Sequence, residues 1–139
     1  MDFDVGPYRL TLPGDATFPG QTERATPHWA LPQFRLGPFD VHTSLLDGTL
    51  QDWRDHVEWT TKHQATIVPI EVNGIPGLTL PASERRLDYA LQSPGQKLIS
   101  IVAWSDHPAR REQQRAVEAI VYTLCTPLRG LCPRVSSPR

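Results

Sequence analysis

The dipeptide Asn73-Gly74 constrains the fold of this chain more than any other short feature of its sequence. It stands between two apolar runs, ATIVPIEV and IPGLTL, and Ile67, Ile70 and Val72 lead into it. Asn-Gly is a preferred centre of the two-residue type I′ turn, which joins neighbouring antiparallel strands. We therefore expect a β-hairpin across these two residues.

Other segments show the alternation of half-buried strands. Such a pattern predicts a strand near residues 7–12, and residues 13–27, rich in proline and glycine, are expected to be loop. The runs HWALPQFRL and FDVHTSLL predict a second hairpin, in which one face of the second strand is apolar and the other carries Asp40, His42 and Ser44. The runs RRLDYALQS and KLISIVAWS are expected to pair, and the nearly continuous apolar run LISIVAW belongs in the middle of the sheet.

The segment GTLQDWRDHVEWTTKH, residues 48–63, has the spacing of an amphipathic helix. Thr49 or Asp47 can cap this helix. Its expected core stripe consists of Leu46, Leu50, Trp53 and Val57. Trp53 is therefore expected to be deeply buried, and so is Trp104, which falls in the apolar run LISIVAW.

A second amphipathic helix is expected near the C-terminus. Asp106 or His107 is the expected cap and Pro108 the expected first-turn residue. Its predicted buried stripe is Ala116, Val117, Ile120, Val121 and Leu124. The element order β-ββ-α-ββββ-α predicts an α+β fold, an antiparallel sheet of about six to seven strands packed with two main helices. Residues 1–126 are expected to form a single domain, and residues 127–139 a flexible C-terminal tail.

Composition limits the classes of protein to which the chain can belong. Its 139 residues can bury a core, and 39% hydrophobic and 21% charged residues are typical of a globular domain. The net charge of −1 argues against a nucleic-acid partner. No apolar run approaches the roughly 20 residues of a membrane helix, so no membrane insertion is expected. The start MDFDVGPYRL is acidic where a signal peptide is basic, so we expect a cytoplasmic protein in which Cys125 and Cys132 are free thiols.

The words RLTLPGD and IEVNGIPGL, together with the order and spacing of the expected elements, resemble the Mog/PsbP-like fold group over roughly residues 5–125. That group includes the photosystem extrinsic protein PsbP, a nuclear Ran-binding protein, a bacterial envelope lipoprotein and the cytoplasmic chaperones of type VI secretion effectors. A transit peptide or a lipoprotein signal is expected for two of these branches, and neither pattern is present at the start of the chain. The Ran-binding branch implies a eukaryotic nucleus, which nothing in the sequence indicates.

The resemblance therefore favours the cytoplasmic bacterial branch, whose role is to bind and shield apolar segments of secreted toxins. The chain departs from that branch after its expected first strand, where the segment ATFPGQTERA stands in place of the polar segment expected for the branch. No binding residue can for this reason be carried over by motif.

Acidic and imidazole side chains on the first helix raise the question of a metal or acid–base site. At 100° per residue, Asp52, His56, Trp59 and His63 form a second stripe beside the core stripe. Asp52 and His56 stand four residues apart and can both reach one metal ion, although a zinc site needs a third protein ligand. The structural alternative is a solvated helix flank in which Asp52 and His56 interact. The functional alternatives are a small-ligand or metal-binding domain whose site includes His56, and a hydrolase that uses Asp52 or His63.

The sequence contains no G-x-S-x-G elbow, no P-loop, no G-x-G-x-x-G and no H-E-x-x-H motif. We therefore expect a non-enzymatic protein without a cofactor. Trp29 and Trp59 fall outside the core stripes, and exposed tryptophan favours contacts with partners. Trp29, Trp59 and His63 are accordingly the candidate partner-binding residues of a protein-binding module, and a homodimer is one form that such binding can take.

Overall fold

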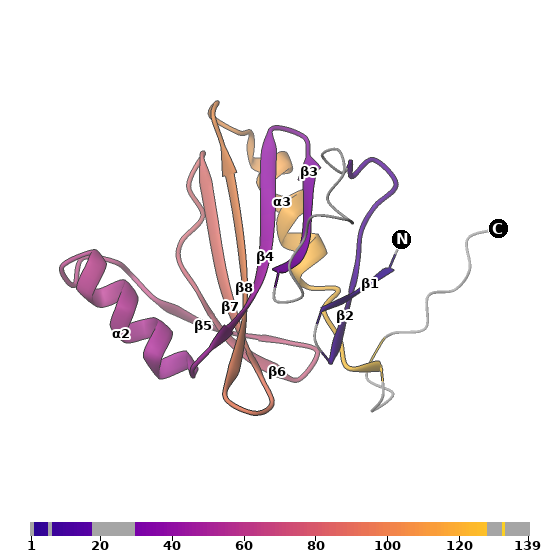
Figure 1. Cartoon of the computed structure of the whole chain (residues 1–139). Coiled ribbons are helices and arrows are strands. Elements are labelled where there is room, and N and C mark those ends of the chain that lie inside the picture. The colour runs from indigo at the N-terminus through magenta and orange to yellow at the C-terminus, as the bar shows by residue number, and fades with distance from the viewer. Residues whose placement is uncertain (1, 6, 18–29, 128–131, 133–139) are drawn as a thin grey trace.

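The computed structural model describes residues 2–5, 7–17, 30–127 and 132 (Figure 1). The elements in chain order are β1 (Asp2–Val5), β2 (Tyr8–Thr11), β3 (Ala30–Leu36), β4 (Phe39–Asp47), α2 (Leu50–Thr60), β5 (Val68–Val72), β6 (Ile75–Thr79), β7 (Arg86–Ser93), β8 (Lys97–Ser105) and α3 (Arg111–Val121). The expected α+β class with an antiparallel sheet is confirmed. Strand β1 was not predicted, because DFDV is short and half acidic. Most of the expected tail, residues 127–139, and most of the loop at residues 13–27 lie outside the described residues.

The strands form two antiparallel sheets. The large sheet has the order β3-β4-β8-β7-β6-β5, and β1 pairs with β2 in a separate hairpin. β8 pairs along its whole length with β4 on one side and with β7 on the other. The prediction that LISIVAW lies in the middle of the sheet is therefore correct.

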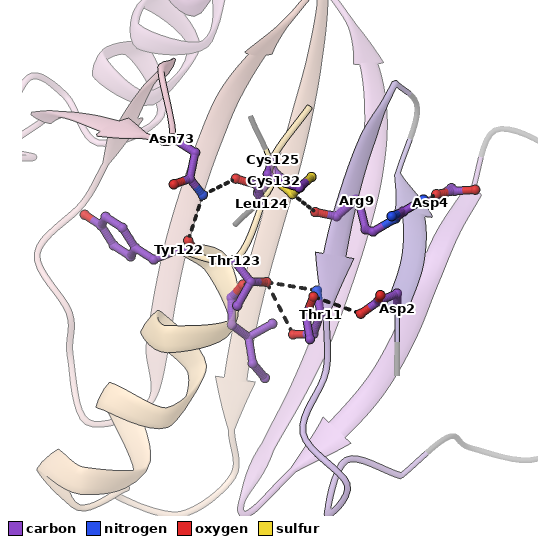
Figure 2. The surroundings of a disulfide bond; sticks show 11 residues. Asp2, Asp4, Arg9, Thr11, Asn73, Tyr122, Thr123, Leu124, Cys125 and Cys132 are labelled. Atoms are coloured by element: carbon purple, nitrogen blue, oxygen red, sulfur yellow. Dashed lines mark hydrogen bonds and ion pairs between the residues drawn. A yellow bond between two sulfur atoms is a disulfide. The ribbon is translucent and has the colours of Figure 1, made fainter. Parts of the chain in front are cut away.

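The turn between β5 and β6 is the hairpin expected at Asn73-Gly74. Both residues have positive φ, 50° for Asn73 and 84° for Gly74, as a type I′ turn requires. The side-chain amide of Asn73 also donates to the backbone oxygens of Tyr122 and Leu124, at 3.1 and 2.8 Å (Figure 2). The turn thus satisfies the carbonyl of Tyr122, the C-cap residue of α3, and that of Leu124 in the segment after the helix.

One face of the large sheet carries the main core, and α3 and the β1–β2 hairpin cover it (Figure 1). Alternation along the strands directs Val41, Ala103 and Leu87, which are partners in register, to this inner face. The large sheet, the β1–β2 hairpin, α3 and the segment after α3 all contribute fully buried side chains, among them Val5, Leu10, Phe34, Phe39, Val41, Leu91, Ile99, Ile101, Val117, Val121 and Leu124. The predicted stripe of the last helix is correct except for Ala116, which is exposed.

The opposite, outer face is covered in part by α2, which packs against β6 and β7. Thr49 caps the helix as expected, and the Leu50 N–H donates to Gln92 Oε1 at 3.1 Å. Of the predicted stripe, Val57 is buried and Leu50 is half-buried, but the expected deep burial of Trp53 and the place of Leu46 in the stripe are wrong. Trp53 is half-buried, and Leu46 lies near the end of β4 and is 44% exposed, because α2 packs against β6 and β7.

The start of α3 also differs from the prediction. The helix begins at Arg111 with Arg110 at the cap position, and neither Asp106 nor His107 caps it. The Ala109 N–H donates to the Glu84 carbonyl at 2.7 Å. This bond holds the chain before Arg110 against the loop that leads into β7, so Pro108 lies before the first turn.

Cys125 and Cys132 form a disulfide with their Cα atoms 4.9 Å apart, which corrects the expectation of two free thiols (Figure 2). Cys125 is buried as expected. Its backbone exchanges two hydrogen bonds with Arg9 of β2, with N···O distances of 2.8 and 3.1 Å. The hydroxyl of Thr123 accepts from the Thr11 N–H at 2.9 Å. The segment after α3 therefore pairs with β2 at Arg9 and Cys125. The disulfide links this paired residue, Cys125, to Cys132.

We expect replacement of both cysteines by serine to lower the free energy of unfolding by about 2 kcal/mol, because the unfolded chain is no longer restricted by the disulfide. The effect is modest, since a short closed loop restricts the unfolded chain less than a long one. Urea unfolding of the oxidised protein and of the double variant measures this difference. Oxidised protein treated with a reductant serves as the control and should match the double variant. Equal midpoints for the oxidised protein and the double variant would show that the disulfide contributes nothing to stability.

Gly77 is expected to be intolerant of even one added methyl group. A Cβ at this position would stand 2.7 Å from the Ala90 carbonyl oxygen and 2.7 Å from Leu91 Cδ2. Gly77→Ala should therefore destabilise the protein by about 1–3 kcal/mol through overpacking between β6 and β7. Gly14→Ala is the matched control, because a Cβ there meets nothing within 4 Å. Thermal or urea unfolding in which both variants behave like the unaltered protein would contradict the close approach.

Candidate binding surface

The outer face of β3, β4, β8 and β7 is a two-row platform of side chains. Strand register aligns Arg35, Asp40, Trp104 and Arg86 in one row across the four strands. The same register aligns Gln33, His42, Val102 and Asp88 in the next row. We call these eight residues the open face, because α2 packs against β6 and β7 and leaves Trp104, near the end of β8, 38% exposed.

Trp104 is held in place by His42. Their rings are stacked, with centroids 4.3 Å apart and planes inclined by 13°. Neither residue is a direct partner of the other in register, so the contact is a diagonal one between β4 and β8. An aromatic ring that is oriented by a neighbour and still reaches solvent is suited to contact a second molecule.

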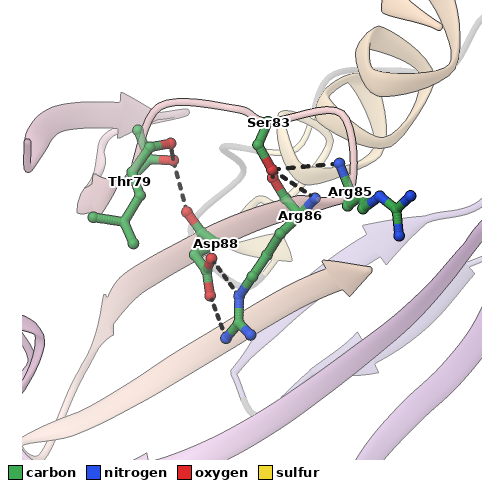
Figure 3. Close-up of polar contacts among 6 residues, drawn as sticks. Thr79, Ser83, Arg85, Arg86 and Asp88 are labelled. Carbon is green, nitrogen blue, oxygen red and sulfur yellow. Dashed lines mark hydrogen bonds and ion pairs between the residues drawn. The ribbon is translucent and has the colours of Figure 1, made fainter. Parts of the chain in front are cut away.

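The open face carries two arginine–aspartate pairs, one that joins β3 to β4 and one within β7. Arg35 Nε donates to Asp40 Oδ1 at 2.8 Å, and Arg86 donates to both oxygens of Asp88 at 2.8 and 3.1 Å (Figure 3). The backbone carbonyl of Asp88 accepts from the Thr79 hydroxyl, and the Asp88 side chain is only 12% exposed. The open face therefore carries four charged groups whose charges cancel within the face.

His42 is partly buried at the centre of the open face. Gln33 Nε2 lies 3.0 Å from His42 Nε2. Burial lowers the pKa of His42 below its ordinary value of 6.5, and the nearby Asp40 carboxylate opposes this effect only in part. His42 is consequently neutral at pH 7.

The candidate partner-binding residues of α2 lie at the end of that helix. Trp59 is 76% exposed, as the helical spacing indicated, and His63 is exposed with Nδ1 3.6 Å from Glu58 Oε2. The chain after the helix passes through positive φ at both Lys62 and His63, 53° and 60°. Trp59, Thr60, Lys62 and His63 line a shallow hollow at this end. Trp29, the third candidate, lies outside the described residues.

The carboxylate of Asp52, a candidate metal ligand together with His56, caps the start of α2 in the structure. Asp52 Oδ2 accepts from the Thr49 N–H at 2.9 Å, and the Asp52 N–H donates to the Thr49 hydroxyl at 3.2 Å. This is a capping box, which satisfies two backbone donors at the helix start. Among residues 2–5, 7–17, 30–127 and 132, no group of three or more His, Cys, Asp or Glu side chains is arranged to hold a metal ion.

Sequence reasoning missed the open face and placed Trp104 in the core. The alternation of Asp40, His42 and Ser44 on the polar side of β4 was recognised, but it was not connected to β8. Pairing of Asp40 with Trp104 puts Trp104 on that polar side. The signal was available only through cross-strand register, because both faces of LISIVAW are apolar.

No family model matches the chain, and no curated protein matches it either. In the described part of the chain, no helix combines the length and apolar character needed to cross a membrane.

Exposure of Trp104 changes the expected cost of truncating it. Trp104→Ala should lower the free energy of unfolding by about 1–2 kcal/mol, less than the roughly 3–5 kcal/mol typical of a buried aromatic residue. Phe39→Ala is the matched core control, since Phe39 lies on the neighbouring strand and is fully buried. Urea unfolding of the two variants compares them directly. A Trp104→Ala cost as large as that of Phe39→Ala would place Trp104 in the core after all.

Proposed function

We propose that the protein is a non-enzymatic binding module whose open face receives an apolar segment of another polypeptide, as a chaperone or adaptor for a secreted effector does. The observation that carries this proposal is the position of Trp104. It is partly exposed and stacked on His42 near the end of β8, between two arginine–aspartate pairs.

This arrangement has the anatomy of a protein-binding site. Tryptophan is enriched among the residues that dominate binding energy, and such residues lie centrally, surrounded by contacts that exclude water. Arg35 and Arg86, with their aspartates, supply a polar rim. Because each arginine is neutralised within the face, a charged partner gains little there, and an uncharged apolar partner meets no unpaired charge.

The width of the open face fits one helix. Six strands at a spacing of about 4.8 Å make a sheet about 24 Å wide. A helix about 10 Å across, such as α2, covers roughly two strands. The inner face is covered by α3 and the β1–β2 hairpin, whereas the outer face has α2 over β6 and β7. A partner helix lying beside α2 across β4 and β8 would complete this layer.

The resemblance to the Mog/PsbP-like group supports the same role, because its cytoplasmic bacterial branch shields apolar segments of secreted toxins. A cytoplasmic location is part of this proposal. The Cys125–Cys132 disulfide argues against that location, because disulfides are rare in the reducing cytosol. Alkylation of free thiols in intact cells of the source organism would decide the location: trapped thiols support the cytoplasm, and their absence supports an oxidising compartment.

The proposal predicts that Trp104, more than Trp59, controls binding. The probe is an uncharged, end-blocked peptide of leucine, alanine and glutamine, about 16 residues long, which spans about 24 Å as a helix. Trp104→Ala should weaken its binding by about tenfold or more, as expected for a central tryptophan. Fluorescence anisotropy of the labelled peptide measures the dissociation constant.

The matched control is the double variant Trp59→Ala with His63→Ala. Both side chains are exposed, so its stability should stay within about 0.5 kcal/mol of the unaltered protein. Its peptide affinity should also be unchanged. Loss of binding in this double variant alone would move the site to the end of α2. Sedimentation at several concentrations tests whether a second copy of the chain binds the open face. A homodimer that dissociates in Trp104→Ala would mean that a second copy covers this face.

A further inference from the structure

We propose that His42 makes the open face sensitive to acid: a proton taken up from water by its Nε2 reverses the contact with Gln33, places a positive charge beside Trp104, and releases an apolar partner. The release step rests on the proposed function, whereas the change at His42 concerns the protein alone. Three residues of the open face carry this proposal: Gln33 contacts His42, and His42 is stacked on Trp104.

The contact with Gln33 defines the protonation state at neutral pH. An amide nitrogen can only donate hydrogen bonds, so Gln33 Nε2 donates to His42 Nε2 across their 3.0 Å separation. His42 Nε2 must then be an acceptor, which is the neutral imidazole with its proton on Nδ1. A protonated Nε2 would bring two donors face to face. The amide of Gln33 would have to turn over and present its oxygen, so the two protonation states correspond to two orientations of one side chain.

The surroundings of His42 determine which state is favoured. On its own strand Asp40 attracts a proton, but this carboxylate already accepts from Arg35 of β3. On β8 the ring faces Trp104, and on β7, two strands away in register, Asp88 is paired with Arg86. No carboxylate of the open face is therefore left for His42 alone. Partial burial then dominates and lowers the pKa of His42, with Asp40 opposing it.

This direction of the pKa determines the direction of the pH effect. Between the folded-state pKa of His42 and the ordinary value of 6.5, the unfolded chain binds more protons than the folded one. The contribution of His42 to stability is thus fully present above pH 6.5 and is lost as the pH falls toward the folded-state pKa. A partner that covers the face removes more water from His42 and lowers its pKa further. Affinity should accordingly fall as the pH falls, by at most about tenfold per pH unit.

The first test follows His42 in the free protein by NMR titration of the histidine ring protons, with His42→Gln used to assign its signals. The unaltered protein should show a pKa of His42 below the ordinary 6.5. Gln33→Glu places a carboxylate acceptor against Nε2 and should raise the pKa of His42. A value for His42 that does not change in Gln33→Glu would overturn the role of the Gln33 contact.

The second test measures binding of the same uncharged peptide at several pH values down to about pH 5. The unaltered protein should bind it about tenfold or more weakly at the acidic end of the range. His42→Gln should remove this dependence, and Gln33→Glu should shift it to higher pH. His63→Gln, which changes an exposed histidine just after the end of α2, is the matched control and should leave the profile unchanged.

The outcomes separate the two proposals. Peptide binding that is independent of pH, or a pH dependence that persists in His42→Gln, overturns acid release and leaves the proposed function standing. Failure of the peptide to bind at any pH contradicts the proposed function and the release step together. The NMR titration then still decides whether Gln33 and His42 form the two-state contact.

Discussion

The pairing of β8 with β4 and β7 is the constraint on which the rest of the structure depends. β8 is hydrogen-bonded along its length on both sides, so its register assigns every residue of three strands to one face or the other. A shift of one residue would move Ile99 and Ile101 out of the core and bring Trp104 into it. The main core and the open face are therefore two results of the same register.

The two faces of the large sheet are covered unequally. The inner face receives α3 and the β1–β2 hairpin, and the ties between them are numerous. The Asn73 turn binds the end of α3, and Arg9 of β2 binds the backbone of Cys125 (Figure 2). The outer face has a single described helix, α2, which begins with a capping box and one bond to Gln92. The main core lies on one side of the sheet, and the accessible ring of Trp104 lies on the other.

Features that depend on neighbouring residues could be predicted from the sequence. The Asn73-Gly74 turn follows from the need for positive φ at two consecutive residues, and the Thr49 cap from the chemistry of one side chain. Exposure of Trp59 followed from helical spacing. Features set by distant segments could not be predicted in this way. The stack of His42 on Trp104 and the disulfide require knowledge of which strands adjoin and where the chain returns after α3.

The two exposed tryptophans are not equivalent as binding groups, and the difference lies in what each must lose on binding. Trp59 is 76% exposed at the end of a helix, so fixing its ring against a partner costs rotamer freedom. Trp104 already rests against His42, and His42 is held by Gln33, so much of that cost is met when the protein folds. Preorganisation of this kind favours the open face over the end of α2. In the proposed acid response, the group that takes up the proton, His42, is also the group that orients Trp104.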